Sequence, residues 1–322
     1  MARLVFVHAH PDDETLATGI ALAHHAALGH EVHVVTATLG EMGEIIPPEL
    51  AHLGADRDDS LGPYRAGELA GALSALGVHG HQLGGAGTYR DSGMVLLAHG
   101  MAGMPPVPDP RSLVAADLDQ AAARLTALLG ELDPDVVVTY DRGGGYGHPD
   151  HIVTRRLVER AVAAGPAGRA VAAYEVVVPR SWAREDRTWL AGHVPPDSGL
   201  QVPTLQQPYP VAVVDDDLVT HVVVDEGARQ RQRQALLAHR TQVRVFDGYY
   251  ALSNAVAARL SGREAFVRLD VASGERAGRR GAAWVQGLAG DDGADRSAQA
   301  SAGPAARAVP GHAAGAERAG TW

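Results

Sequence analysis

The chain has 322 residues, of which 46% are hydrophobic and 20% are charged, so it can build one large or two modest domains and is too apolar for wholesale disorder. It contains no cysteine, which excludes disulfides, iron–sulfur clusters and thiolate metal sites, and any zinc ion would need histidine and carboxylate ligands. The formal net charge is −10 and the sequence has no dense basic cluster, which argues against a nucleic-acid partner bound through its phosphates.

Hydropathy and side-chain inventory narrow the class further. No apolar run reaches the roughly 18–20 residues that a membrane-spanning helix needs, and the N-terminal stretch lacks the features of a secretory signal. We therefore expect a cytoplasmic protein with no membrane partner. All 28 basic residues are arginine, which excludes a lysine Schiff base.

Strand-like and helix-like segments alternate over the first 180 residues. In chain order the pattern predicts a strand at Arg3–Val7, a helix at Thr15–Leu28, a strand at Glu31–Leu39, a helix at Tyr64–Leu76, a weak strand at His81–Leu83, a helix at Asp117–Leu132, a strand at Val136–Tyr140, a helix at Pro149–Ala164 and a strand at Val171–Val178. This alternation predicts an α/β fold with a Rossmann-like, mostly parallel sheet flanked by helices. Ligands of such sheets bind beyond the carboxyl ends of the strands.

The pattern weakens after about residue 180. The later segments are a stretch rich in proline and polar residues at 182–210, a hairpin pair at 211–214 and 220–224, a helix at 226–239 and a strand at 265–269. We predict three parts: a catalytic domain over 1–180, a smaller C-terminal α+β region over 181–289 that completes the substrate pocket, and a disordered tail over 290–322.

A polar turn, His10-Pro11-Asp12-Asp13-Glu14, comes directly after the first predicted strand. Pro11 restricts its own backbone and disfavours helix at His10, so the side chains of this turn have defined directions. One imidazole and one carboxylate can bind the same ion, while a neighbouring carboxylate acts as a base on water. Capping of the following helix is the alternative explanation for the three acidic residues, but it does not explain His10 and Pro11.

A second polar segment, DRGGGYGHPDH at 141–151, follows the predicted strand that ends at Tyr140. Its glycines let the backbone pass close to a ligand. Pro149 suits the first position of a helix, which places Asp150 and His151 in the first turn. The alternative is a flexible loop with a solvated acid and a capping histidine.

Together the two segments supply two histidines and one carboxylate, which is the ligand set of a catalytic zinc with one position open for water. Such a metal lowers the pKa of bound water from about 15.7 to near 7. Further acids and a histidine remain for proton transfer, so the residues predict hydrolysis of an unactivated carbonyl compound such as an amide. The same ligands would also accept Fe²⁺ or Co²⁺.

The pairing of His10-Pro11-Asp12-Asp13-Glu14 with His148-Pro149-Asp150-His151 resembles the zinc-dependent PIG-L/LmbE-like deacetylases, which act on N-acetylglucosaminyl compounds. Segments that are similar to the mycothiol-biosynthetic branch of this family lie at 38–41, 64–69, 83–87, 90–94, 144–151 and 251–254. The resemblance implies a hydrolase that removes the N-acetyl group from N-acetylglucosaminyl inositol, giving glucosaminyl inositol and acetate. It also implies one Zn²⁺ per subunit and a small-molecule partner, and leaves a homo-oligomer open.

The same resemblance implies roles for individual residues. The zinc ligands it implies are His10, Asp13 and His151. Asp12 would be the general base, taking a proton from water. His148 would stabilise the oxyanion or act as an acid, oriented by Asp150, and Tyr146 would donate to the same oxyanion.

Two further residues are assigned to the substrate on the resemblance alone. Arg65 and Asp91 would hold sugar or inositol hydroxyls. By their local sequence they would instead be a surface ion-pair residue and a turn former.

Other functions are compatible with parts of the pattern. A mycothiol S-conjugate amidase shares the zinc motif, and a non-catalytic sugar-binding relative would share the fold. A dinucleotide-dependent enzyme would need a Gly-x-Gly-x-x-Gly turn where this chain has His-Pro-Asp-Asp-Glu. Glycoside hydrolysis by two carboxylates does not explain the two histidines. The region 182–209 and the tail show no similarity to the family.

Overall fold

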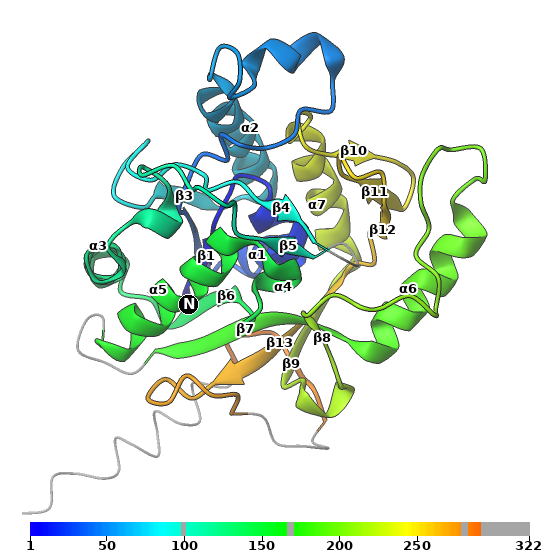
Figure 1. The fold of residues 1–322 in the computed structure, drawn as a ribbon. Coiled ribbons are helices and arrows are strands. Elements are labelled where there is room, and N and C mark those ends of the chain that lie inside the picture. Colours follow the sequence, from blue (N-terminus) through cyan, green and yellow to red (C-terminus); the bar gives the residue numbers. More distant parts are fainter. Residues whose placement is uncertain (98–100, 166–170, 278–282, 291–322) are drawn as a thin grey trace, which may run out of the picture. The chain divides into compact units, whose positions relative to one another are not determined.

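The computed structural model describes residues 1–97, 101–165, 171–277 and 283–290 (Figure 1). Residues 1–289 form one compact unit. Apart from Gly290, the predicted tail lies outside the described residues. Among the helices in these ranges, none combines the length and apolarity needed to cross a membrane.

A nine-stranded sheet forms the centre of this unit. Its strands are β1 (Arg3–His8), β2 (Glu31–Thr36), β3 (His79–Gln82), β6 (Val136–Tyr140), β7 (Ala172–Pro179), β8 (Val213–Val214), β9 (His221–Val224), β13 (Arg263–Leu269) and β14 (Val285–Gln286). The order is β14-β9-β13-β7-β6-β1-β2-β3, with β8 beside β7. All neighbours from β3 to β7 are parallel, whereas β13 is antiparallel to β7 and β9. The predicted α/β fold with a mostly parallel sheet is confirmed.

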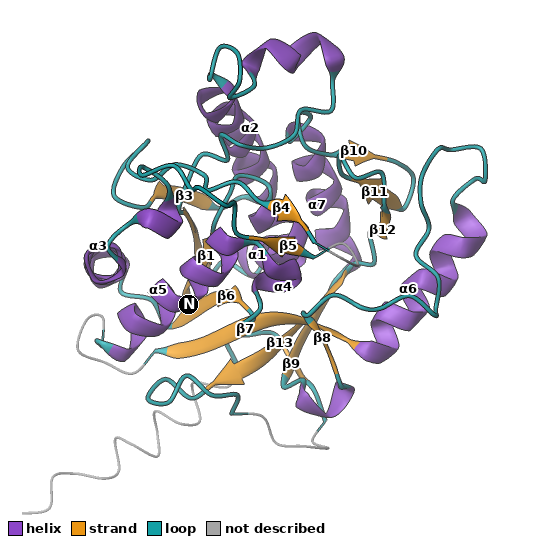
Figure 2. Cartoon of the chain, in the orientation of Figure 1, coloured by secondary structure: helices purple, strands orange, loops and turns teal. Residues whose placement is uncertain are grey.

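Helices cover both faces of the sheet, which Figure 2 sets apart from the strands by colour. The helices are α1 (Asp13–Ala27), α2 (Leu61–Leu76), α3 (Leu118–Leu132), α4 (Gly144–Gly147), α5 (Pro149–Ala163), α6 (Arg180–His193) and α7 (Glu226–Ala238). Leu4 and Phe6 of β1 pack with α1, α2 and α7, whereas Val5 and Val7 pack with α3 and α5. Successive residues of a strand point to opposite faces, so a strand that is apolar throughout fits a sheet covered on both sides.

Two small sheets complete the unit. One joins β4 (Val95–Leu96) to β5 (Ala102–Gly103), and the other joins β10 (Arg244–Val245), β11 (Tyr249–Ala251) and β12 (Ala257–Arg259). Within the described ranges, three short 3₁₀ helices lie at Pro48–Leu53, Leu113–Ala115 and Asp216–Leu218. The strands β9, β13 and β14, which follow residue 180, belong to the main sheet. The division into domains at residue 180 stays a prediction.

One prediction beyond residue 180 is wrong, and one helix there was not predicted. The stretch that is rich in proline and polar residues begins with helix α6, because its prolines all lie after His193 and the residues before them are free to be helical. The expected hairpin does not form: β8 pairs with β7, and β9 pairs with β13 and β14. Residues 216–218 between them form a 3₁₀ helix instead of a tight turn.

Candidate metal and catalytic site

The two polar segments meet at one point of the sheet. One follows the carboxyl end of β1 and the other follows the carboxyl end of β6, and these two strands are parallel neighbours. The chain continues from β1 to β2 on one side of β1, and β6 lies on its other side, so the strand order reverses here. A parallel sheet opens a crevice at such a reversal, which is the usual position of its ligand site.

Three side-chain atoms from these segments form a small triangle. His10 Nδ1 lies 3.1 Å from Asp13 Oδ2 and 3.3 Å from His151 Nε2, and the last two atoms are 3.2 Å apart. All three residues are buried. Ligands about 2.0–2.2 Å from a tetrahedral zinc are separated from one another by roughly 3.3–3.5 Å. The triangle therefore has the size of three zinc ligands, and these are the three residues predicted from the sequence.

The remaining ring nitrogens of the two histidines have acceptors. His10 Nε2 lies 3.2 Å from Asp150 Oδ2 and 3.5 Å from Asp91 Oδ1, and His151 Nδ1 lies 3.1 Å from the carbonyl oxygen of Gly144. Metal-binding histidines usually donate their second N–H to a carboxylate or carbonyl in this way. These bonds leave lone pairs on His10 Nδ1 and His151 Nε2, the two nitrogens that face Asp13.

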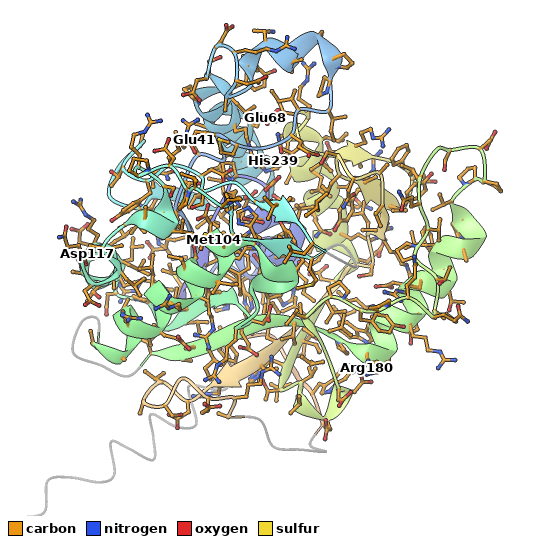
Figure 3. The ribbon with its side chains drawn as sticks, viewed as in Figure 1. Glu41, Glu68, Met104, Asp117, Arg180 and His239 are labelled. Carbon is orange, nitrogen blue, oxygen red and sulfur yellow. The ribbon has the colours of Figure 1, made fainter. Side chains whose placement is uncertain are left out.

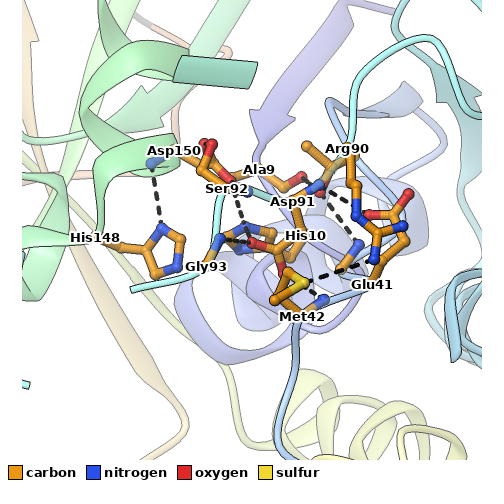
Figure 4. A network of polar contacts seen from close by, with 12 residues as sticks. Ala9, His10, Glu41, Met42, Arg90, Asp91, Ser92, Gly93, His148 and Asp150 are labelled. Carbon is orange, nitrogen blue, oxygen red and sulfur yellow. Dashed lines mark hydrogen bonds and ion pairs between the residues drawn. The ribbon is translucent and has the colours of Figure 1, made fainter. Parts of the chain in front are cut away.

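Among the residues that the structure describes, two other groups of side chains come close enough for a shared ion. They are His10, His148 and His151, and His10, Asp91 and Asp150. The second group would use His10 Nε2, yet its carboxylates already accept backbone N–H groups from Ser92, Gly93 and Met42, as Figure 4 shows. The Asp13 side of His10 remains the predicted position of the ion.

The charges around His10 favour a cation. Burial alone would lower the pKa of His10, but Asp91, Asp13 and Asp150 raise that pKa well above its usual range. Burial would likewise raise the pKa of Asp13, but the neighbouring His151 and His10 hold it well below its usual range. The site thus stabilises positive charge beside an ionised carboxylate, as a metal centre requires.

Tyr140, the last residue of β6, supports the carboxylate of Asp13. Its hydroxyl accepts the backbone N–H of Ala9 at 2.8 Å and donates to Asp13 Oδ2 at 2.8 Å. Its ring stacks on His151 with the centroids 4.2 Å apart. Sequence reasoning missed this residue because it was part of an apolar strand. A hydroxyl at the last strand position, next to the polar segment, was the available signal.

Asp12 lies beside the triangle without belonging to it. Its side chain makes no capping bond to α1, so the capping explanation is wrong for this residue. Burial raises the pKa of Asp12 to about 6, with Arg65 opposing the rise and Asp13 adding to it. A buried carboxylate whose pKa lies near the working pH suits the predicted role of base.

Arg65 is buried and contacts Asp12. Its guanidinium lies 3.1 Å from Asp12 Oδ2 and donates to the carbonyl oxygens of Pro11 and Gly40. These contacts place Arg65 against the base and its turn. Its predicted contact with sugar hydroxyls stays a prediction.

His148 and Asp150 contact each other through the main chain. The N–H of Asp150 donates to His148 Nδ1 at 3.1 Å, so the neutral ring carries its proton on Nε2. Burial, together with His10 and His151, lowers the pKa of His148 to about 2. The carboxylate of Asp150 accepts from the N–H and hydroxyl of Ser92 and faces His10. Sequence reasoning missed Ser92, whose contact depends on a distant loop.

Asp91 joins the site from the loop after β3. Its carboxylate accepts the N–H groups of Gly93 and Met42, and its own N–H donates to Glu41 at 2.9 Å. Although burial opposes it, the neighbouring His10 holds the pKa of Asp91 far below its usual range. Figure 4 shows this carboxylate beside His10. The predicted contact of Asp91 with substrate hydroxyls stays a prediction.

Tyr146 lies among the glycines of the loop that follows β6, at residues 143–147. Its ring centroid lies 5.3 Å from that of His151 and 6.1 Å from that of His148. The loop is held by Asp141, whose carboxylate accepts the N–H groups of Gly143 at 2.8 Å and Gly145 at 2.6 Å. Gly145 has φ 76° and ψ −66°, a conformation that a side chain would strain. Burial raises the pKa of Tyr146, so its hydroxyl stays protonated.

Glu14, which accepts the N–H of Asp12, belongs to a buried ion pair that was not predicted from the sequence. His239 Nε2 lies 2.8 Å from Glu14 Oε1, and neither side chain is exposed. Burial opposes both charges, but each partner stabilises the other: the pKa of Glu14 is lowered and the pKa of His239 is raised. Glu14 belongs to the predicted motif. His239 is the residue that follows helix α7, and only the tertiary structure brings this helix close to the site.

Known proteins are similar to this chain in sequence. Residues 5–162, which include every predicted site residue, match the family described as PIG-L, GlcNAc-PI de-N-acetylase. The 1D-myo-inositol 2-acetamido-2-deoxy-alpha-D-glucopyranoside deacetylase of Streptomyces scabiei is 46% identical over 279 residues, which cover 81% of this chain and 83% of that enzyme. The protein of the same name from Thermobifida fusca is 43% identical over 281 residues, covering 83% of this chain and 92% of that protein.

The similarity to solved structures is weaker. The N,N'-diacetylchitobiose deacetylase from Pyrococcus horikoshii is 19% identical, with a TM-score of 0.45, over 74% of this chain and 70% of that chain.

Proposed function

Because the chain belongs to the PIG-L family of de-N-acetylases, we propose that it removes the acetyl group from 1D-myo-inositol 2-acetamido-2-deoxy-α-D-glucopyranoside in mycothiol biosynthesis. The products are acetate and the free amino sugar linked to inositol. The names of relatives that are 46% and 43% identical over most of the chain support this substrate.

The observation that carries the proposal is the triangle of His10 Nδ1, Asp13 Oδ2 and His151 Nε2, with edges of 3.1–3.3 Å. Two imidazoles and one carboxylate of this size fit zinc and leave its fourth position free. When bound, zinc supplies a lowered pKa for water and polarises the acetamido carbonyl.

Asp12 is the base in this proposal. It takes the proton that the attacking water loses as the new C–O bond forms. The carboxylate is buried, close to the metal ligands, and has a pKa of about 6 that leaves it ionised at neutral pH. When the C–N bond breaks, the amine nitrogen takes up the proton that Asp12 accepted from water, and acetate is released.

His148 and Tyr146 stabilise the oxyanion that develops on the acetamido oxygen. The bond from the Asp150 N–H to His148 Nδ1 keeps the ring neutral and leaves Nε2–H as a donor. Tyr146 keeps its proton and offers a second donor. Donors that are already in place stabilise the transition state more than the ground state. This favours oxyanion stabilisation over the alternative role of His148 as an acid.

The test is a hydrolysis assay with the purified protein. Acetate and free-amine release are measured from the N-acetylglucosaminyl inositol and, in parallel, from a mycothiol S-conjugate, before and after chelation. We expect activity on the first substrate that disappears with the chelator and returns with zinc. Activity confined to the conjugate would assign the chain to the amidases, and absence of hydrolysis of either substrate would refute the proposal.

Asp12→Asn is the matched variant for the base. It should retain one zinc ion per chain and lose roughly 10²- to 10⁴-fold in kcat, because general base catalysis contributes about that factor. Turnover equal to that of the unmodified protein would remove Asp12 from the mechanism.

A further inference from the structure

The backbone of Asp12 adopts an unusual conformation. Its φ is 114°, and the other non-glycine residues with positive φ in the described part of the chain, Asp59, Asp133 and Ala255, have φ between 44° and 54°. Those three lie near the left-handed helical minimum, whereas Asp12 lies outside it. Such backbone strain persists only where surrounding contacts hold it.

Two buried charged side chains hold the peptide that precedes Asp12. The N–H of this peptide, which belongs to Asp12, donates to Glu14 Oε2 at 2.9 Å. The carbonyl oxygen, which belongs to Pro11, accepts from Arg65 Nη2. A carboxylate on one edge and a guanidinium on the other fix the rotation of the peptide plane, and so the direction in which the Asp12 side chain leaves the backbone.

Glu14 is in turn held by the far end of the chain. His239 Nε2 lies 2.8 Å from Glu14 Oε1, which also accepts from Thr15 Oγ1 at 2.5 Å. Both Glu14 and His239 are completely buried. A buried carboxylate needs such a partner, because an unpaired charge in the interior is strongly unfavourable.

The segment that carries His239 is anchored to α2. The N–H and hydroxyl of Thr241 donate to the two carboxylate oxygens of Glu68, at 2.9 and 2.6 Å. Figure 3 shows Glu68 and His239 near one another, where α2 and α7 pack together. His239 therefore has a fixed position relative to the turn after β1.

We infer that Glu14 and His239 are a positioning pair: the carboxylate of Glu14 holds the Pro11–Asp12 peptide in its strained conformation, and His239 holds Glu14. Neither residue touches the substrate. The inference rests on the proposed function, since it assigns the pair an effect on the step in which Asp12 takes a proton from water. It also gives helix α7, outside the family match at 5–162, a part in the reaction.

The test compares Glu14→Gln and His239→Gln with the unmodified enzyme in kcat, KM and bound zinc. Each variant keeps the side-chain size and removes the charge. We expect kcat to fall about 10- to 100-fold, the effect of displacing a catalytic group by about 1 Å, while KM stays within about twofold and zinc content stays at one per chain. If Glu14→Gln does not fold, His239→Gln provides the same readouts.

A double variant separates positioning from general destabilisation. In the Asp12→Asn background the base is gone, so adding Glu14→Gln should change kcat by less than twofold. The control is Glu264→Gln, which alters another buried glutamate side chain that accepts N–H groups of α1, from Ile20 at 2.8 Å and Ala21 at 2.9 Å. It should leave kcat unchanged.

The outcomes distinguish this inference from the proposed function. An unmodified enzyme without deacetylase activity would refute the proposed function. An active enzyme whose Glu14→Gln and His239→Gln variants keep normal kcat would refute the inference alone. So would a multiplicative loss in the double variant, or a loss of kcat that is explained by lost zinc.

Discussion

The hydroxyl of Tyr140 joins the end of a strand to the candidate metal ligands. It accepts the N–H of Ala9 and donates to Asp13 Oδ2, so the carboxylate of Asp13 is tied to β6 although Asp13 itself lies at the start of α1. An outer hydrogen bond of this kind orients a ligand before the metal arrives.

Tyr140→Phe should therefore weaken zinc binding by about 10- to 100-fold, the usual effect of losing an outer hydrogen bond to a ligand. Competition with a chromophoric chelator measures the affinity. Tyr174→Phe is the matched control, because Tyr174 is a buried tyrosine on the neighbouring strand β7 whose hydroxyl faces His221. Equal zinc affinity in the Tyr140 variant and the unmodified protein would contradict the assigned role.

At the scale of residues, the sequence predicts the candidate metal ligands better than the residues that form hydrogen bonds to the ligands and the base. His10, Asp13 and His151 come together as expected, because each lies in a turn after a predicted strand or in the first turn of the helix that follows. The contacts of Ser92 and the Glu14–His239 contact depend on packing between distant segments, which leaves no local signature in the chain. For Tyr140 the only local signal was its hydroxyl at the end of a strand.

At the scale of elements, the main-sheet strands and the long helices before residue 180 are predicted by their clean periodicity, whereas the short elements β4, β5 and α4 are not predicted. Helix α6 is also not predicted, because most of its fourteen residues belong to the stretch that is rich in proline and polar residues. The hairpin prediction fails for another reason. The apolar segments on both sides of residues 215–217 have the length of hairpin strands, but the open edges offered by β7 and β13 pair with them instead.

Strand β13 is tied to helix α1 by a buried carboxyl group. Glu264 accepts the N–H groups of Ile20 and Ala21. Burial raises the pKa of Glu264 to about 8 from 4.5, and the two backbone hydrogen bonds oppose the rise without cancelling it. Burial therefore favours the protonated form of Glu264 in the folded protein.

The consequence is a pH dependence of stability. In the unfolded chain Glu264 loses its proton near pH 4.5, whereas the folded protein keeps it until about pH 8. The stabilisation that comes from the raised pKa is complete below pH 4.5 and is lost as pH rises through 8. Glu264→Gln does not titrate, so its free energy of unfolding should decrease less than that of the unmodified protein between pH 5 and pH 8.

Denaturant unfolding at these two pH values measures the difference. Between pH 5 and pH 8, we expect the free energy of unfolding of the unmodified protein to decrease by a few kcal/mol more than that of Glu264→Gln. Parallel pH dependences in the two proteins would show that Glu264 is ionised in the fold.

At the scale of the whole molecule, function depends on the order of the strands. The alternation of elements predicts a layered sheet, but no local pattern states that β6 lies beside β1 or that β13 and β9 extend the same sheet. That order brings turns separated by more than a hundred residues to a single point. The same folding returns His239 to the turn after β1.

The central claim is that these turns share one ion on the Asp13 side of His10. Anomalous diffraction at the zinc absorption edge, from crystals grown with zinc, locates that ion directly. We predict one strong peak about 2.0–2.2 Å from His10 Nδ1, Asp13 Oδ2 and His151 Nε2. A peak that lies instead between His10 Nε2, Asp91 and Asp150 would contradict the claim. The absence of a peak near His10 and His151 would also contradict it.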